Sequence, residues 1–342
     1  MARRILWASL ALTPVALVAR FGFHANATSL FVLSGVALVP LAWLIGESTE
    51  HAAQHTGHGV GAFLNASFGN APELIIALFA IHDALPNVVR GTITGSVVSN
   101  MLLVLGAAMI AGGDGKVDSR SLRLQLGAVF AAVLILLIPS VPGWHGSRDR
   151  HSLFVVTVPV ALVLLCAYLV ITVHNLRVHR SGAQAEPDEN AWPLRTSLMW
   201  LTVATVATAF VSEILVNSLT AFGHAVGLDE FFIAVVIVAI VGNAAEHGGA
   251  IFVARRGNTQ LATEIAITSS MQVAVFVAPA VALLSWIVGS GLTLSFRMIE
   301  IVTMGAAAVV AAAVVWDGRS RRWEGFLLVA VYGLAVIWYL LA

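Results

Sequence analysis

The chain has 342 residues, of which 59% are hydrophobic and only 11% are charged, and its formal net charge is zero. Soluble globular domains are typically about 45–50% apolar and about 25% charged, so this composition excludes an ordinary soluble domain and indicates a polytopic membrane protein. The charge balance gives no sign of nucleic-acid binding. The single cysteine, Cys166, excludes an internal disulfide and a cysteine-based zinc or haem site.

Apolar runs of roughly 20 residues mark candidate transmembrane helices. The sequence contains eleven such runs, joined mostly by short polar connections. In chain order they cover residues 5–22, 28–46, 58–81, 86–111, 124–141, 152–173, 197–218, 230–253, 261–288, 298–316 and 324–341. We therefore predict an all-α fold that crosses the membrane eleven times.

The first run follows two arginines and ends near "HANA", so it is compatible with either a signal peptide or a retained helix. We favour a retained helix, because the helix count then divides into one extra span and two equal halves. The predicted domains are the N-terminal helix 1–27, a first five-helix half 28–174, a polar linker 175–195 and a second five-helix half 196–342.

The positive-inside rule predicts the orientation. With a cytoplasmic N-terminus, thirteen Lys and Arg residues fall inside and five fall outside. We therefore expect a cytoplasmic N-terminus and linker, an external C-terminus, and a bacterial-type inner (plasma) membrane as the location.

An internal repeat joins two distant motifs, "FGNAPELIIALFA" at residues 68–80 and "VGNAAEHGGAIFV" at 241–253. A gapless shift of 173 residues superimposes them, and the same shift carries "GSVVS" at 95–99 onto "TSSMQ" at 268–272. The copies are five spans apart, so the second enters the membrane from the opposite side. Inverted repeats with an interrupted helix in each half are typical of secondary transporters, whose sites lie near the bilayer midplane.

Each motif combines a helix breaker with an ionisable group. Asn70 and Asn243 align, as do Glu73 and Glu246, and Pro72 removes a backbone donor from the first copy. Freed backbone carbonyls, amide oxygens and carboxylates suit a hard cation such as Ca²⁺, which takes about 6–8 oxygen ligands. Two carboxylates in a low-dielectric site favour protonation, whereas a divalent cation favours their ionised form. Competition between the cation and protons is thus a physical basis for antiport.

A second polar cluster follows each motif. We expect its side chains to orient the carboxylates or line the ion path, with ordinary hydrogen bonding between helices as the alternative. The cluster comprises Ser96, Ser99, Asn100, Ser269, Ser270 and Gln272.

The segments "LNASFGNAPELIIALFA" with "GSVVSNMLLVLG", and "IVAIVGNAAEHGGAI" with "SSMQVAVFVAP", resemble the two α-repeats of the cation/proton exchanger (CAX) family. That family belongs to the Ca²⁺/cation antiporter superfamily, and the resemblance runs from about residue 28 to the end. It implies an N-terminal span with two inverted five-helix halves, and Ca²⁺ exported or sequestered in exchange for protons.

The resemblance also implies roles for individual residues. Glu73 and Glu246 match the cation- and proton-binding acids, and Asn70 and Asn243 match their polar neighbours. His247 matches the histidine that follows the acid of the second repeat.

Further titratable residues lie near the predicted span ends. By resemblance, Glu50 matches an acid near the cytoplasmic entrance, and Glu213 is similar to its counterpart in the other half, so both are candidates for gating or proton access. His51, His55 and His58 follow Glu50, and we interpret them as part of a solvated segment, with pH sensing as the alternative.

These observations favour a Ca²⁺/H⁺ antiporter that works by alternating access, with Ca²⁺ as substrate, no cofactor and no enzymatic activity. Pro72 and Thr268 depart from the family pattern, so Na⁺ coupling or Mn²⁺ transport stays open. A cation channel and an intramembrane metalloenzyme are the alternatives of another class, although no HExxH motif occurs. Expected partners are Ca²⁺, H⁺ and the lipid bilayer; the oligomeric state stays open.

Overall fold

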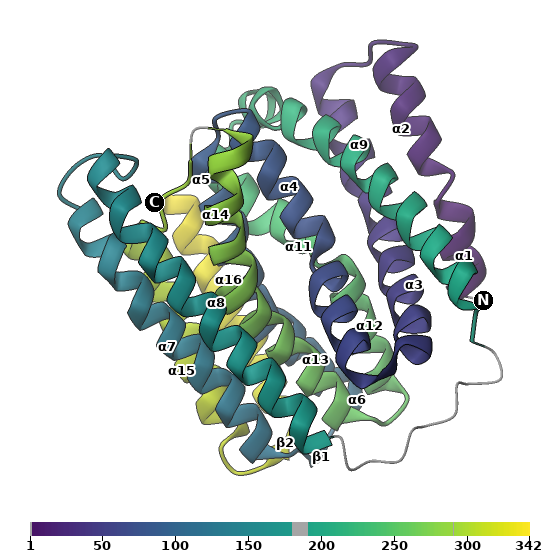
Figure 1. Ribbon diagram of the computed structural model, residues 1–342, viewed down its shortest axis with the longest axis vertical. Coiled ribbons are helices and arrows are strands. Elements are labelled where there is room, and N and C mark those ends of the chain that lie inside the picture. The colour runs from purple at the N-terminus through teal and green to yellow at the C-terminus, as the bar shows by residue number, and fades with distance from the viewer. Residues whose placement is uncertain (1, 180–190, 290) are drawn as a thin grey trace. The chain divides into compact units, whose positions relative to one another are not determined.

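The computed structural model describes residues 2–179, 191–289 and 291–342, and their regular secondary structure is helical apart from one ladder of two short strands (Figure 1). Residues 180–190, which include most of the predicted linker, lie outside the described residues. Some helical side chains are also outside the description, namely those of residues 2, 3, 57–63, 65, 66 and 175–179.

The chain divides into two compact units, each built from separate stretches of sequence. Unit 1 contains the described residues of Met1–Phe79, Cys166–Asp229 and Val241–Ala245, and unit 2 contains those of Ala80–Leu165, Glu230–Ile240 and Glu246–Ala342. Both predicted five-helix halves contribute to both units.

Unit 1 is organised around two long helices, α3 and α9, which pack along each other. Its elements are α1 (Ala2–Ser9), α2 (Leu12–Phe21), α3 (Ala27–Gly69), most of α4 (Ala71–His82), the end of α8 (His151–His179), α9 (Leu194–Val226), the end of α11 (Ala239–Gly242) and the start of α12 (Ala244–Arg255).

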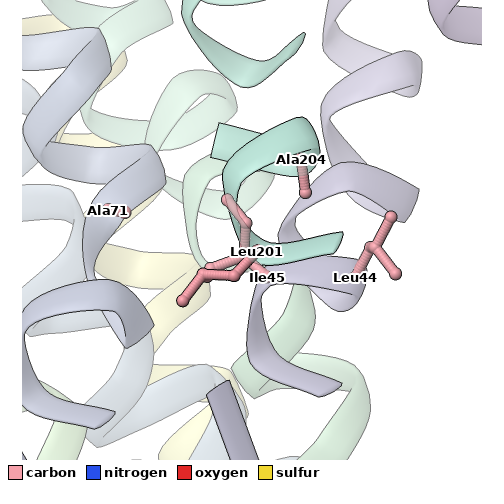
Figure 2. Close-up of a cluster of buried hydrophobic side chains, with 5 residues drawn as sticks. All are labelled: Leu44, Ile45, Ala71, Leu201 and Ala204. Carbon is pink, nitrogen blue, oxygen red and sulfur yellow. The ribbon is translucent and has the colours of Figure 1, made fainter. Parts of the chain in front are cut away.

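The apolar packing of unit 1 joins three of these helices. Figure 2 shows the cluster, in which Leu44 and Ile45 of α3 lie with Leu201 and Ala204 of α9 and with Ala71 of α4. All five side chains are buried. Burial of apolar surface stabilises this arrangement, and it ties the start of α4 to the long helices.

Unit 2 contains the remaining elements. They are the end of α4, α5 (Pro86–Ser99), η1 (Asn100–Val104), α6 (Leu105–Gly112), β1 (Gly115–Lys116), α7 (Ser119–Gly143), most of α8, α10 (Glu230–Phe232), η2 (Ile233–Val238), the start of α11, most of α12, α13 (Thr259–Gln272), η3 (Val273–Val277), α14 (Ala278–Val288), α15 (Met298–Val315), β2 (Arg319–Ser320) and α16 (Arg322–Leu341). The η elements are π-helical turns, a feature often found at functional sites.

Unit 2 also buries a non-helical segment, residues 292–296, between α14 and α15. Three of its backbone N–H groups donate to buried hydroxyl oxygens of neighbouring helices. The pairs are Leu292 with Ser285 at 2.7 Å, Leu294 with Thr157 at 3.0 Å, and Phe296 with Ser140 at 3.0 Å. Irregular backbone is tolerated at membrane depth only where protein groups satisfy it in this way.

The predicted number of spans is not confirmed. Within the described residues, nine helices are long and apolar enough to cross a membrane, and the bent pair Glu230–Gly242 and Ala244–Arg255 makes a tenth. The expected boundary between the spans 28–46 and 58–81 is wrong, because α3 continues through residues 47–57 and ends only at Gly69. The polar stretch at 47–57 has no proline and no glycine before Gly57, so the helix is not interrupted there.

The sequence repeat is also a repeat of structural elements. A shift of 173 residues carries both ends of α4 onto both ends of α12, α5 onto α13, and η1 onto η3. The prediction that each motif interrupts a helix is therefore confirmed in both copies. The opposite membrane direction of the copies stays a prediction.

Candidate functional site

The first motif places its acid at the start of a helix. α3 ends at Gly69, and the carbonyl of Asn70 accepts a hydrogen bond from the backbone N–H of Leu74 at 3.1 Å, which begins α4. Pro72 occupies the first turn of α4, where the missing N–H has no intrahelical role. Glu73 stands in the same turn, where the positive end of the helix dipole favours a carboxylate. Asn70 is fully buried and Glu73 is 3% exposed.

The break of the second motif lies beside this acid within unit 1. A Cβ atom added to Gly242 would lie 3.6 Å from Cγ of Glu73 and 3.8 Å from Cδ1 of Ile76. The helix axis bends by 56° between Gly242 and Ala244, and Asn243 at the bend is fully buried. Unit 1 thus brings Asn70 and Glu73 of the first repeat together with the helix break of the second repeat.

Glu246 stands in the first turn of α12, in unit 2. The Ser269 hydroxyl forms a hydrogen bond with its carboxylate. The Oε2 atom of Glu246 is buried and has no hydrogen-bond partner among the described residues. A buried carboxylate oxygen without a partner is costly, so this atom is suited to a proton or a cation.

A chain of hydrogen bonds extends from Glu246 through both polar clusters in unit 2. The Asn100 amide donates to the Ser269 hydroxyl at 2.9 Å, and its carbonyl oxygen lies 3.0 Å from Nε2 of His247. Because that carbonyl accepts, His247 carries a proton on Nε2. Asn100 is fully buried and His247 is 9% exposed. Asn100, Ser269 and His247 therefore hold Glu246 in one network.

The remaining cluster residues have more structural contacts. Ser270 donates to the backbone carbonyl of Val97 at 3.3 Å, which joins α13 to α5, and Ser99 donates to the carbonyl of Ser96 at 3.3 Å. Ser96 is fully buried and Gln272 is half-buried. For Ser270 and Ser99 these bonds fit the alternative interpretation, hydrogen bonding within and between helices.

The candidate gating acids lie within helices rather than at helix ends. Glu50 is an exposed residue of α3, which continues beyond it, and Glu213 is an exposed residue in the interior of α9. Neither belongs to the hydrogen-bonded network around Glu246. A role for either residue in gating or proton access stays a prediction.

Two of the three neighbouring histidines hold the start of α9. The ring of His51 stacks on Trp192 at 4.7 Å, and Nε2 of His55 bonds to the Trp192 carbonyl oxygen at 2.8 Å. These two are therefore not part of a merely solvated segment. The side chain of His58 lies outside the described residues.

An ionic network in unit 2 was not identified from the sequence. Arg90 of α5 is completely buried and donates to both carboxylate oxygens of Asp149 at 2.8 and 3.1 Å, and to the carbonyl oxygen of Thr293 at 3.3 Å. An arginine inside an apolar run was the signal for this network, because such a charge needs a partner. The signal did not identify the partner, which is 59 residues away.

Neighbouring charges shift the pKa values of Asp149 and Arg148, the two network residues in the loop before α8. Partial burial raises the pKa of Asp149, but the hydrogen bond and positive charge of Arg90 outweigh that effect and hold the pKa below its ordinary value. Burial and the charge of Arg90 lower the pKa of Arg148. Arg148 also lies 3.9 Å from the buried carboxylate of Glu300 on α15. The network thus connects α5, the loop before α8 and α15.

Among the described residues, no three His, Cys, Asp or Glu side chains are grouped so as to hold a metal ion. The residues predicted to supply oxygen ligands are divided between the two compact units. Unit 1 holds Asn70, Glu73 and Asn243, and unit 2 holds Glu246 with its network.

Several known proteins resemble this chain over nearly its whole length. The Ca(2+)/H(+) antiporter of Aphanothece halophytica is 33% identical, covering 98% of this chain and 96% of its own. The Ca(2+)/H(+) antiporter ChaA of Bacillus subtilis is 34% identical, covering 93% of each. The solved structure of native YfkE matches with a TM-score of 0.86 at 30% identity, covering 99% of this chain and 100% of the other. The structure of the H⁺/Ca²⁺ exchanger CAX matches in fold, with a TM-score of 0.76 at 17% identity, over 99% of this chain and 92% of its own.

The family model described as sodium/calcium exchanger protein matches residues 26–177 and 196–341. Residues 178–195, most of the predicted linker, separate the two matched regions, which together contain both breaks and both polar clusters. The predicted superfamily and the all-α membrane fold are thereby confirmed. The chain belongs to the sodium/calcium exchanger protein family, and it is an integral membrane transporter of that family.

Proposed function

We propose that this chain exchanges Ca²⁺ for H⁺ across the membrane by alternating access. The observation that carries the proposal is the pair of broken helices, each with an asparagine at the break and a glutamate in the next turn, in a chain that matches Ca²⁺/H⁺ antiporters end to end. The transported ion is the substrate, and the mechanism needs no cofactor and no enzymatic step.

Glu73 and Glu246 are the proposed binding groups for both the cation and the protons. Three observations support this. Each acid stands in the first turn of a helix that begins at a break, Gly242 adjoins Glu73, and Glu246 follows Gly242 by four residues. Carboxylates that share a low-dielectric site favour protonation, and a divalent cation reverses that preference. Ca²⁺ and protons then exclude each other from the same oxygens.

The other oxygens of the proposed site come from the breaks themselves. Asn70 and Asn243 supply amide oxygens, and backbone carbonyls beside each break complete a coordination shell of about 6–8 oxygens. Ser269 and Asn100 orient Glu246 through the hydrogen bonds described above, and His247 anchors Asn100 from the other side. Ser270 links α13 to α5 and Ser99 bonds within α5, whereas Ser96 and Gln272 are proposed to line the ion path.

The proposal extends to the arrangement in the membrane. The two halves 28–174 and 196–342 rock against each other, with the linker 175–195 and the N-terminus in the cytoplasm and the C-terminus outside. The excess of basic residues on the predicted inner side supports this orientation in a bacterial inner membrane. Glu50 and Glu213 are proposed to control proton access.

The decisive experiment measures Ca²⁺-dependent proton flux in proteoliposomes. Glu73→Gln and Glu246→Gln should each lower the flux by about 100-fold or more, because a neutral amide does not balance the charge of Ca²⁺ and does not titrate. Asp83→Asn, beyond the end of α4, is the matched control and should keep the flux of the wild type. Normal transport by either glutamine variant would refute the site.

A second set of measurements determines whether H⁺ or Na⁺ is the ion exchanged for Ca²⁺. Ca²⁺ uptake should follow an imposed pH gradient and should be indifferent to a sodium gradient. Uptake that follows sodium and ignores pH would overturn the proton coupling while leaving the two-glutamate site intact. Conductance without counter-ion coupling would instead indicate a channel.

A further inference from the structure

Two basic side chains face each other across the only strand ladder in the described residues. β1 and β2 are antiparallel, and the register pairs Lys116 directly with Arg319. Side chains that are directly opposite in such a ladder have Cβ atoms about 4.5–5.5 Å apart, and like charges there are destabilising. Both residues are exposed, and neither has an ion-pair partner among the described residues. The pairing therefore leaves two positive charges together without an ion-paired carboxylate among the described residues.

Two further arginines extend this surface at the start of α7. Arg120 and Arg123 lie three and six residues after Val117, which follows β1, and neither forms an ion pair among the described residues. The Arg123 guanidinium lies 4.9 Å from the ring centre of Trp316. We call Lys116, Arg120, Arg123 and Arg319 the ladder patch.

The neighbouring acids already bond to other groups. Asp118 caps α7 by accepting from the N–H of Arg120, Asp317 accepts from Nη2 of Arg321 at 2.6 Å, and Glu324 accepts from Nη1 of Arg321 at 2.7 Å. The hydrogen bond to Glu324 and the charge of Asp317 raise the pKa of Arg321. Two more acids complete the set: Asp114 accepts from the N–H of Arg322, and Glu264 accepts from Gln260. Asp118 and Asp317 accept from the backbone N–H groups of Arg120 and Arg319, but none of these acids forms an ion pair with a side chain of the ladder patch among the described residues.

The ladder patch lies where three membrane spans end. α7 begins at Ser119, α15 ends at Val315 and α16 begins at Arg322, and all three are apolar enough to cross the bilayer. Residues at such a level are beside the lipid headgroups. Trp316 and Trp323, which are 65% and 60% exposed, have the character of interfacial anchors there. The surface thus combines cations that form no ion pair among the described residues with exposed indole rings at headgroup depth.

We propose that the ladder patch binds the phosphate group of an anionic phospholipid. Lys116 and Arg319 approach one phosphate from its two sides, which removes their mutual repulsion, and guanidinium and ammonium donors both suit phosphate oxygens. Trp316 packs beside the glycerol region and holds Arg123 over its ring. A lipid is favoured over a soluble phosphate because the patch borders three spans and two exposed tryptophans. The proposal is independent of the transport mechanism.

The test uses the full chain purified in a neutral detergent, with thermal denaturation as readout. Phosphatidylglycerol should raise the denaturation midpoint by several degrees more than phosphatidylcholine does. The double variant Lys116→Gln/Arg319→Gln should lose at least half of that difference. Arg255→Gln/Arg256→Gln removes the same charge from the exposed end of α12 and is the matched control, which should keep the difference.

Without lipid, a repulsive Lys116–Arg319 pair and a stabilising one predict opposite changes in the denaturation midpoint. Lys116→Gln should denature at or above the midpoint of the wild type, because the substitution removes a repulsion. A lower midpoint would mean that the pair stabilises the fold, and would overturn the proposal. Equal losses in both double variants would also overturn it, by showing a general charge effect. Inorganic phosphate at millimolar concentration should not replace the lipid; if it did, the site would be one for free anions.

Discussion

Gly95 offers a sharp test of the contact between the first polar cluster and the second broken span. In unit 2, α5 crosses η2 at this residue. A Cβ atom added to Gly95 would lie 2.0 Å from the backbone oxygen of Val235 and 2.6 Å from Cβ of Ala239. Small residues let helices in membranes approach this closely. Gly95→Ala fills that contact with one methyl group.

The magnitude follows from the geometry. An ordinary contact needs about 3.4 Å, so the Val235 backbone would have to move by about 1.4 Å, the difference from the 2.0 Å available. Overpacking costs about 1–3 kcal/mol, and the upper end applies because a backbone carbonyl cannot rotate away. The better helix propensity of alanine offsets about 1 kcal/mol. We therefore expect Gly95→Ala to lower the free energy of unfolding by about 2 kcal/mol.

Gly127 of α7 provides the matched control, since a Cβ atom there would meet nothing within 4 Å. Gly127→Ala should stabilise the chain by about 1 kcal/mol, which separates the two variants by about 3 kcal/mol. Thermal denaturation in detergent should show this as a difference of roughly 4 °C, because an unfolding entropy of about 2.1 cal/mol/K per residue amounts to about 0.7 kcal/mol/K for 342 residues. Gly95→Ala should also slow transport, because η2 leads directly into the break at Gly242. Equal midpoints for the two variants would refute the close approach.

Two further predictions concern buried polar groups of unit 2. Because Arg90 holds the pKa of Asp149 below its ordinary value, the stabilisation from this carboxylate is complete above about pH 4 and is lost as pH falls through the lowered pKa. Wild-type denaturation midpoints should therefore fall more steeply below about pH 4 than those of Asp149→Asn, and parallel pH profiles would contradict this. Ser285→Ala leaves the buried N–H of Leu292 without its acceptor and should cost about 1–3 kcal/mol by thermal denaturation. The exposed Ser152→Ala should cost nothing measurable, and equal midpoints would count against the role of Ser285.

The local chemistry of the two motifs predicted where the helices break. Gly69, Asn70 and Pro72 end α3 and begin α4, and the same offset of 173 residues places the second break at Asn243. Such breaks depend on backbone donors and conformations within a few residues, so they can be read from one short stretch. The prediction failed at residues 47–57, because polarity alone does not end a helix.

The partners of the buried polar groups could not be predicted in the same way. Asn100 joins His247, which is 147 residues away, and Arg90 joins Asp149 across 59 residues. The sequence marked each of these residues as unusual within an apolar run. The sequence contained no information on which other polar residue would form a hydrogen bond with Asn100 or with Arg90.

By itself, then, the sequence determined that the chain is a helical membrane protein with two related broken helices, and that Asn70, Glu73, Asn243 and Glu246 stand at the breaks. These properties follow from composition, local helix chemistry and an internal repeat, all of which are written along the chain. Only the tertiary structure decided that Gly242 lies against Glu73 and that Ser269 and Asn100 hold Glu246. Those contacts depend on how distant helices pack, and packing is set by the shape of whole surfaces rather than by any one segment.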